Sequence, residues 1–323
     1  MTDTRWILLL LACWLTTPVL AAELTVNQLQ FIGSHNSYKQ AMSPEHAQAL
    51  RARNPAAADS LEYAHLPLPE QLDLGLRKLE LDIFYQPQTG SFVVGHVQVI
   101  DMNSHCNDLG ACLEQIKAWS DANPRHAPLW ISFNTKDQAI EGLPDPSPFA
   151  AEALKLLDQH LQAALGDRLI WPSQVRPAGS DRPVWPPLDE ARGKILLILD
   201  EGGDKRANYM QGWRERPMFM NVPPEHPASA IQIINDPLAQ GELIRQRVVA
   251  GFMVRTRADA DTVEARADST ARREAALASG AQAVSTDYYL PAVHFGNDYQ
   301  VRIEGGVRCN PVTAPADCTV SED

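Results

Sequence analysis

The sequence of 323 residues predicts an α/β fold, a single TIM-type (β/α)8 barrel, regular or distorted. Strand-like segments alternate with helix-like segments along most of the chain, which is typical of a parallel sheet covered by helices. The run 194–200 is apolar on both faces, as buried parallel strands are. A barrel of this kind uses about 250 residues, so the chain has room for one and needs no second domain.

The first three predicted strands lie in the N-terminal third of the chain. The apolar run 29–32 breaks into a small polar turn that contains His35 and Asn36, and the run 78–84 alternates strictly between apolar and polar residues. A third β-rich run, 92–97, follows a turn signal and contains His96. We therefore expect three consecutive strand ends to carry polar side chains.

The remaining elements are predicted in alternation: a strand at 129–133, a helix at 149–165, a strand at 194–200, a strand at 252–255, a helix at 271–278 and a strand at 281–287. The last helix is expected to be capped by Asp268 or Ser269 and to end at Gly280. The proline-rich stretch 171–187 predicts a long surface connection, and 214–227 is predicted to be irregular.

Two carboxylates share one face of the predicted strand 78–84. Leu79, Leu81 and Ile83 occupy the other face, so Glu80 and Asp82 point the same way. Like charges side by side repel, which favours a shared cation or a basic neighbour. A solvated strand face is the simpler reading of an isolated pair, but the neighbouring strand ends favour a site.

Polar residues at the other strand ends complete this candidate site. The carboxyl ends of barrel strands meet at one mouth, which should bring His35, Asn36 and His96 to the carboxylates. Asn134 and Lys136 share one face of the strand that begins at 129 and should reach the same mouth. Two imidazoles can transfer protons, and carboxylate and amide oxygens can hold Ca²⁺ or another divalent cation.

The N-terminus predicts a secretory signal peptide over residues 1–22, which leaves 23–323 as the barrel domain. Arg5 precedes a short apolar run, and small residues surround a cleavage site near Ala21 and Ala22. The protein is therefore expected to be secreted or periplasmic. A lipoprotein site at Cys13 is a weaker alternative, because the apolar run continues past it.

The four other cysteines predict two disulfides in an oxidising compartment. Three pairings are open, and closure of short loops favours Cys106 with Cys112 and Cys309 with Cys318. A zinc site formed by His105, Cys106 and Cys112 competes with this prediction, but the spacing of a zinc motif is absent.

Several segments together resemble a known family: 33–38, 71–82, 95–97 with Asp101 and Cys106, 112–119, 135–136 and 285–288. The sequence is similar to the calcium-dependent phosphatidylinositol-specific phospholipases C of bacterial secreted type, within the superfamily of phospholipase-C-like phosphodiesterases. The resemblance spans about residues 29–289, and its first three segments are specific only in combination.

The resemblance implies cleavage of phosphatidylinositol-type phosphodiesters to diacylglycerol and an inositol phosphate, cyclic or open. His35 and His96 would be the acid–base pair, with His96 favoured as the acid although the order stays open. The implied calcium ligands are Asn36, Glu80, Asp82 and Asn134.

One position departs from the family pattern. The family commonly has an acidic metal ligand where this chain has Asn134, which puts calcium affinity or the identity of the metal in doubt. Lys136 and Arg255 are candidate phosphate contacts, with Arg257 a further one. Tyr289 or its neighbour Tyr288 could pack on an inositol ring, although core packing explains either residue equally well.

Net charge restricts the partners. The chain has a formal charge of −12, which loss of one Arg and one Asp with residues 1–22 does not change. This charge argues against a nucleic-acid partner and against tight binding to anionic membranes. It is compatible with a monomer that contacts a membrane surface transiently to reach a phosphoinositide, or with a soluble phosphodiester substrate.

Two rival functions stay open. A glycerophosphodiester phosphodiesterase would also use two histidines and a Glu-x-Asp pair around a divalent ion. That family usually has Arg-Gly where this chain continues from His35 with Asn36, and it lacks a counterpart of the segment 106–119. A non-catalytic barrel that binds a sugar phosphate is the other rival, prompted by Asn134.

Overall fold

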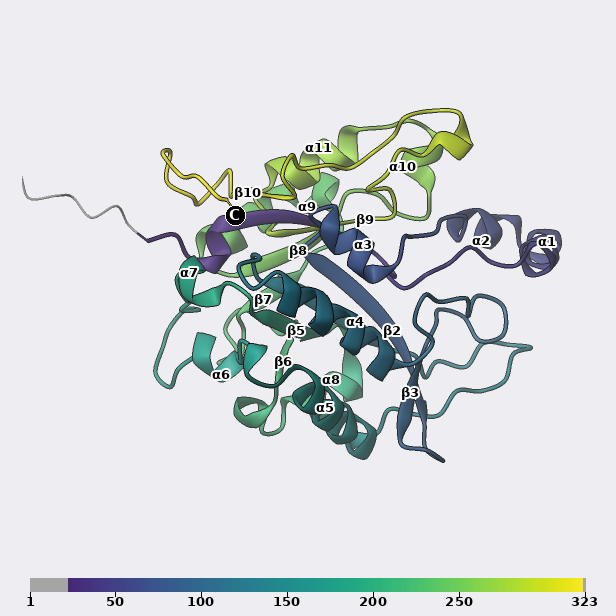
Figure 1. Ribbon diagram of the computed structural model, residues 1–323, viewed down its shortest axis with the longest axis horizontal. Helices are drawn as coiled ribbons and strands as arrows, with labels where there is room; N and C mark the ends of the chain where they lie inside the picture. The colour runs from purple at the N-terminus through teal and green to yellow at the C-terminus, as the bar shows by residue number, and fades with distance from the viewer. Residues whose placement is uncertain (1–22, 322–323) are drawn as a thin grey trace, which may run out of the picture.

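Parallel strands form a barrel in the computed structural model, which describes residues 23–321 (Figure 1). The barrel strands are paired in the order β6-β5-β4-β2-β1-β9-β8-β7, and all their mutual pairings are parallel. Their bounds are β1 (Leu29–Ser34), β2 (Lys78–Gln86), β4 (Leu129–Thr135), β5 (Ile195–Leu199), β6 (Met218–Met220), β7 (Ile231–Ile233), β8 (Met253–Arg257) and β9 (Ala283–Thr286). The prediction of a TIM-type barrel is therefore confirmed. The predicted signal peptide, residues 1–22, lies outside the described residues.

The barrel is nearly closed between β6 and β7. One isolated parallel bridge, Asn221 to Ile231, joins these two edges within the described residues. By contrast, β2 and β4 pair over six residues, from Lys78 with Trp130 to Ile83 with Thr135. The wall is thus less extensively paired at the seam between β6 and β7 than between β2 and β4.

The third predicted barrel strand is not part of the wall, which corrects the prediction for 92–97. Strand β3 (Ser91–Val94) runs antiparallel to β2, with Gln86 opposite Ser91 and Ile83 opposite Val94. The connection between β2 and β3 is a tight turn, and a turn this short permits only an antiparallel hairpin. The hairpin returns the chain to the mouth, where the Gly95 N–H donates to the Asp82 carbonyl at 3.1 Å.

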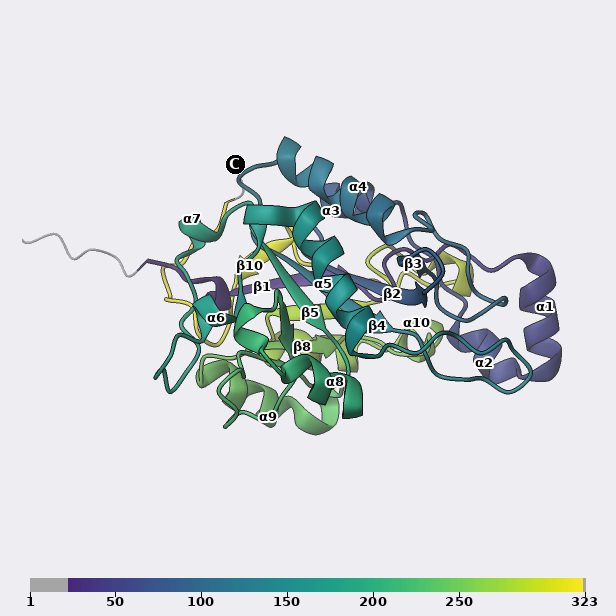
Figure 2. The same ribbon diagram turned by 90° about the horizontal axis from the view of Figure 1, so that it is seen from below.

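Helices cover the outside of the barrel. The main ones are α3 (Leu68–Asp73), α4 (Leu109–Ala122), α5 (Ala151–Leu165), α8 (Gly203–Met210), α9 (Pro237–Val249) and α11 (Ala271–Ala278). Short helices are α6 (Pro172–Val175), α7 (Leu188–Ala191), α10 (Val263–Arg266) and the 3-10 turns η1 (Val26–Gln28), η2 (Gly166–Arg168), η3 (Trp213–Glu215) and η4 (Val293–Phe295). Two further helices, α1 (Pro44–Arg53) and α2 (Pro55–Ser60), stand out from the barrel at the end where β3 lies (Figures 1 and 2). A last strand, β10 (Val307–Cys309), pairs antiparallel with β1.

Three local predictions need correction. Helix α11 has the predicted bounds, but its N-cap is Thr270, whose hydroxyl donates to Glu274 at 2.6 Å, and not Asp268 or Ser269. The stretch 214–227 contains β6, which is too short to show a strand period. The stretch 171–187 contains α6, and Trp185 within it is buried, so it is more than a surface connection.

The barrel interior changes from apolar to polar toward the mouth. Strand β4 shows the change, because Trp130, Ser132 and Asn134 follow one another along its inner face. Trp130 is fully buried and packs in an apolar cluster inside the barrel, on the side of the strands' amino ends. Its indole N–H donates to the Ser132 hydroxyl at 2.8 Å. An apolar layer thus closes the interior of the barrel, and the polar side chains lie between this layer and the mouth.

None of the helices in residues 23–321 combines the length and the apolar character that a bilayer-spanning segment requires.

Candidate active site

A cavity of about 580 Å³ opens at the carboxyl ends of the strands. Segments far apart in the sequence contribute to its lining, and the residues used below are His35, Glu80, His96, Asn134, Lys136, Lys205, Arg255 and Arg257. The position agrees with the general location of active sites in this barrel architecture.

The two carboxylates of β2 lie together in this mouth. Glu80 and Asp82 are both buried, at 2% and 0% exposure, so the face of β2 that carries them is the barrel interior and not a solvated surface. The amide nitrogen of Asn134 donates to Glu80 Oε1 at 3.1 Å and to Asp82 Oδ1 at 2.9 Å. The predicted convergence of β2 and β4 side chains is present.

Buried cations offset the charge of Glu80. Its Oε2 lies 2.5 Å from Lys78 Nζ and 2.9 Å from an Arg255 guanidinium nitrogen. Burial alone would raise the pKa of Glu80, but these two cations hold it well below the usual range. Burial also lowers the pKa of Lys78 to about 8. Glu80 is therefore an ionised group with two permanent counter-ions.

Asp82 has a different counter-ion. The Lys136 ammonium lies 2.7 Å from Asp82 Oδ2, and the Lys136 side chain is 29% exposed. The Lys136 side chain therefore joins a fully buried carboxylate to the open cavity.

His35 is held by a carboxylate that the sequence analysis did not identify. Its Nδ1 lies 2.8 Å from Asp287 Oδ1, and its Nε2 lies 3.6 Å from Glu80 Oε1. Burial, with the nearby Arg257 cation, lowers the pKa of His35. Arg257 also pairs with Asp287 at 3.3 Å. Asp287 ends the predicted strand 281–287, and this position at the mouth is the signal that could have identified it.

His96 is also held by a buried carboxylate, Asp101, which the sequence analysis did not identify as part of the site. Its Nδ1 lies 3.1 Å from Asp101 Oδ2, and Asp101 also accepts from the fully buried Lys39 at 2.8 Å. Burial opposes ionisation of Asp101, but the hydrogen bond from His96 and the Lys39 charge lower its pKa. The chain bends tightly between these residues, where the Asp101 N–H donates to the Val97 carbonyl at 2.9 Å, but the segment 97–100 contains no Gly, Pro, Asn or Asp that would have predicted the bend.

Asn36 directly follows His35 at the end of β1. It is 1% exposed and has a left-handed backbone, with φ 47°. Its amide nitrogen donates to the Tyr63 hydroxyl at 2.8 Å, whereas its buried Oδ1 has no hydrogen-bond partner. An orphaned buried oxygen is costly unless something occupies it, and a cation would satisfy it.

The predicted ligands fit a calcium ion in donor chemistry. Asn36, Glu80, Asp82 and Asn134 offer two carboxylates and two amide groups, and oxygen is the donor that calcium prefers. Residues 23–321 contain no cluster of three or more His, Cys, Asp or Glu arranged to hold a metal, so any such site depends on the amides as well. Asn134 now points its nitrogen at the carboxylates and would have to turn its oxygen toward a cation.

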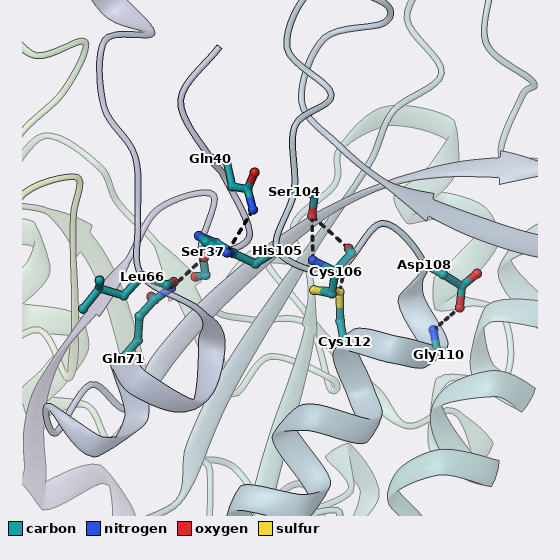
Figure 3. The surroundings of a disulfide bond; sticks show 10 residues. All are labelled: Ser37, Gln40, Leu66, Gln71, Ser104, His105, Cys106, Asp108, Gly110 and Cys112. Atoms are coloured by element: carbon teal, nitrogen blue, oxygen red, sulfur yellow. Dashed lines mark hydrogen bonds between the residues drawn. A yellow bond between two sulfur atoms is a disulfide. The ribbon is translucent and has the colours of Figure 1, made fainter. Parts of the chain in front are cut away.

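The loop that carries His96 and Asp101 is anchored by a disulfide. Cys106 and Cys112 are bonded, which ties this loop to the first turn of α4 (Figure 3). The predicted pairing is confirmed here and for Cys309 with Cys318, and the zinc alternative is wrong because both cysteines are oxidised. Beside the disulfide, His105 Nδ1 lies 3.1 Å from the Gln40 amide (Figure 3).

The residues predicted to contact substrate differ in whether they line the cavity and in how exposed they are. Lys136, Arg255 and Arg257 all line the cavity, but Arg255 is only 4% exposed and is engaged with Glu80. Tyr289 does not line the cavity. Its hydroxyl accepts from the Leu66 N–H at 2.8 Å and its ring stacks on His65, which are contacts of the packing role weighed in the sequence analysis. The inositol contact stays a prediction.

Comparison with known proteins agrees with this geometry. The family model described as phosphoinositide phospholipase C, Ca²⁺-dependent, matches residues 24–95 and 90–311. A search of curated proteins found no match.

Solved structures share the fold at low sequence identity. One is the calcium-dependent phosphoinositol-specific phospholipase C of a Pseudomonas species in complex with myoinositol, with a TM-score of 0.57 and 15% identity over 88% of this chain and 95% of that one. Another is the Ca²⁺-dependent phosphatidylinositol-specific phospholipase C of Streptomyces antibioticus, with a TM-score of 0.56 and 18% identity over 82% of this chain and 95% of that one.

The family match covers most of the chain and decides between the predicted functions, in favour of the phospholipase C enzymes and against the glycerophosphodiesterase and the non-catalytic barrel. The chain belongs to the family of calcium-dependent phosphoinositide phospholipases C.

Proposed function

We propose that this protein cleaves phosphatidylinositol-type phosphodiesters to diacylglycerol and an inositol phosphate, cyclic or open, by histidine acid–base catalysis. One observation carries the proposal. His35 and His96 line the same cavity, and each is held at Nδ1 by a buried carboxylate, so each ring has its Nε2 left for chemistry.

In this mechanism His35 is the base and His96 the acid. The inositol 2-hydroxyl transfers its proton to His35 Nε2, and its oxygen forms a bond to phosphorus. The bond from phosphorus to the diacylglycerol oxygen breaks, and His96 Nε2 supplies the proton to that oxygen. The lowered pKa of His35 supports the assignment, because a neutral imidazole is available to accept a proton near neutral pH.

Asn36, Glu80, Asp82 and Asn134 would hold the calcium ion. Bound there, calcium would acidify the attacking hydroxyl and offset negative charge at phosphorus. The orphaned Oδ1 of Asn36 supports this role. Lys136 and Arg257 are the proposed phosphate contacts, because both are cationic and line the cavity.

Access to a lipid substrate needs only transient contact with a membrane. Two large apolar side chains are exposed on loops near the cavity, Val99 at 57% and Ile140 at 41%. A net charge of −12 disfavours prolonged binding to anionic lipid. The two disulfides support secretion into an oxidising compartment, where a monomeric enzyme would meet such lipids.

The test is hydrolysis of phosphatidylinositol in calcium and in EDTA, with glycerophosphoinositol and glycerophosphocholine assayed in parallel. We expect diacylglycerol release from phosphatidylinositol that stops on chelation and returns when calcium is restored. Release that persists in EDTA would overturn the calcium assignment.

The matched variants are His96→Ala and His294→Ala, because His294 is an exposed histidine that does not line the cavity. Loss of a general acid should lower kcat by about 10²–10⁴-fold in the first variant and leave the second unchanged. Full turnover by folded His96→Ala protein would remove His96 from the mechanism.

A further inference from the structure

Lys136 differs from the other cations of the mouth in how it is held. Lys78 Nζ contacts Glu80, the Ser34 carbonyl at 2.9 Å and the Ser285 hydroxyl at 3.1 Å, and it is fully buried. Arg255 is similarly fixed, between Glu80 and the Asn235 side chain at 2.6 Å. Movement of either cation away from Glu80 would leave a buried carboxylate without that counter-ion, so both cations are fixed parts of the barrel.

The Lys136 ammonium has a single anchor. Among the described residues Asp82 is the one side chain that it pairs with, at 2.7 Å, and its side chain is 29% exposed. The backbone of Lys136 is fixed, because its N–H donates to the Ile83 carbonyl at 2.8 Å. Only the flexible side chain therefore has to move for the ammonium to leave Asp82, and it would stay within the cavity when it did.

The same carboxylate is a predicted calcium ligand. The two Asp82 oxygens are now occupied by Lys136 and by the Asn134 amide nitrogen, which lies 2.9 Å from Oδ1. A divalent cation at Asp82 and an ammonium at 2.7 Å from the same carboxylate repel each other strongly in a partly buried site. A calcium ion bound to Asp82 would therefore favour departure of the Lys136 ammonium from this carboxylate.

We propose that Lys136 is an exchangeable counter-ion of the calcium site, held by Asp82 when calcium is absent and transferred to the substrate phosphate when calcium binds. The inference rests on the proposed calcium site. In this inference Lys136 has two opposite effects. Its ammonium competes with calcium for Asp82 when no ligand is bound, and it binds the substrate phosphate when calcium is bound.

The exchange couples the two ligands. An anionic phosphate gives the displaced ammonium a new partner, so the phosphate should favour calcium binding, and calcium should favour phosphate binding to the same extent. This reciprocal effect would retain calcium most firmly when substrate is present. The amide at Asn134 strengthens the competition, because it supplies no negative charge to offset the ammonium.

The test is calorimetric titration of calcium into chelator-treated full-length protein, with and without inositol 1-phosphate. We expect Lys136→Met to bind calcium about fivefold more tightly than the unaltered protein in the absence of phosphate, at the low end of the range for coupled sites. The same variant should show a smaller gain in calcium affinity on addition of inositol 1-phosphate, and a lower kcat/KM for phosphatidylinositol.

Lys205→Met is the matched control. Lys205 lines the same cavity but pairs with Asp137 at 2.9 Å and Glu201 at 2.8 Å, so its removal changes the local field without freeing Asp82. We expect its calcium affinity to change less than twofold. An equal increase in calcium affinity in both variants would show that removal of any nearby positive charge is enough, and would overturn the exchange.

Two further outcomes separate this inference from the proposed function. Calcium affinity that is unchanged or weaker in both Lys136→Met and Lys136→Gln, with native circular dichroism, overturns the exchange while the calcium site stands. Absence of calcium binding to the unaltered protein overturns the calcium site itself, and the exchange with it.

Discussion

At the scale of single residues, the two imidazoles of the mouth have the same kind of partner. Each binds a buried carboxylate through Nδ1, His35 at 2.8 Å from Asp287 and His96 at 3.1 Å from Asp101. Such a contact fixes the ring orientation and keeps the proton on Nδ1, which leaves Nε2 to accept or donate toward substrate. In the proposed mechanism the carboxylates are positioning residues, because they would act through the imidazoles.

Asp287→Asn tests this role. An amide can turn its oxygen or its nitrogen to His35 and no longer stabilises the protonated ring, so we expect kcat to fall by about 10²–10⁴-fold. The measurement is steady-state hydrolysis of phosphatidylinositol by folded protein. Asp298→Asn, at an exposed position, is the control and should keep full turnover. Retention of activity by Asp287→Asn would contradict the role.

At the scale of elements, two irregular segments shape the mouth. The hairpin of β2 and β3 turns the chain back toward Asp82, and the loop that follows carries both His96 and Asp101. The Cys106–Cys112 bond fixes the end of this loop to α4 (Figure 3). A rigid loop matters here because a small displacement of a catalytic group can be costly to the rate.

The two disulfides should therefore have different effects when removed. Replacing Cys106 and Cys112 together by Ser should lower the free energy of unfolding by about 2 kcal/mol and also lower kcat, because the loop with His96 is released. Replacing Cys309 and Cys318 should destabilise the protein to a similar degree and leave kcat unchanged. Urea unfolding and steady-state kinetics measure both effects. Equal kcat values in the two double variants would show that the loop needs no anchor.

The seam of the barrel is a second prediction at this scale. Strands β6 and β7 are three residues each and meet at one bridge, whereas β2 and β4 share six paired positions. Fewer hydrogen bonds lower the free energy of local opening. We expect amides of Met218–Met220 and Ile231–Ile233 to exchange with deuterium about tenfold faster or more than those of β2 and β4, as measured by peptide mass spectrometry. Equal protection would contradict a weak seam.

At the scale of the whole molecule, acidic groups buried in the barrel make stability depend on pH. Asp259 is fully buried, and accepts hydrogen bonds from the Thr286 hydroxyl and from the Asp287 N–H at 2.8 Å. Burial, with the neighbouring Asp287 charge, raises the pKa of Asp259 to about 7. The folded protein therefore holds a proton that the unfolded chain releases at lower pH.

The raised pKa of Asp259 determines the direction in which stability changes with pH. Between the ordinary carboxyl pKa of about 4 and the folded value of about 7, the folded state binds more protons than the unfolded state. The free energy of unfolding should fall as pH rises through this window, by up to about 1.4 kcal/mol per pH unit from this group. Asp259→Asn should flatten that slope in urea unfolding at several pH values, and exposed Asp189→Asn should not. Identical slopes in all three proteins would contradict the assignment.

The sequence alone determined the fold class and the chemical groups of the site. The strand period placed Glu80 and Asp82 on one face, and the barrel rule brought them to the same mouth as His35. His96 also lines this mouth, but it reaches it from the loop after the β2–β3 hairpin and not from the end of a barrel strand. Short loops between cysteines gave both disulfides. These features could be predicted because each depends on spacing within a short segment, or on the shared direction of parallel strands.

Only the tertiary structure decided which groups pair within the mouth. His35 and Asp287 are 252 residues apart, and no local pattern indicates that they touch. The pairing of Glu80 with Arg255 and of Asp82 with Lys136 likewise depends on the relative heights of side chains from different strands. Strand register and side-chain reach fix those heights. Periodicity reports the face of a strand, but it contains no information on the position of one strand along its neighbour.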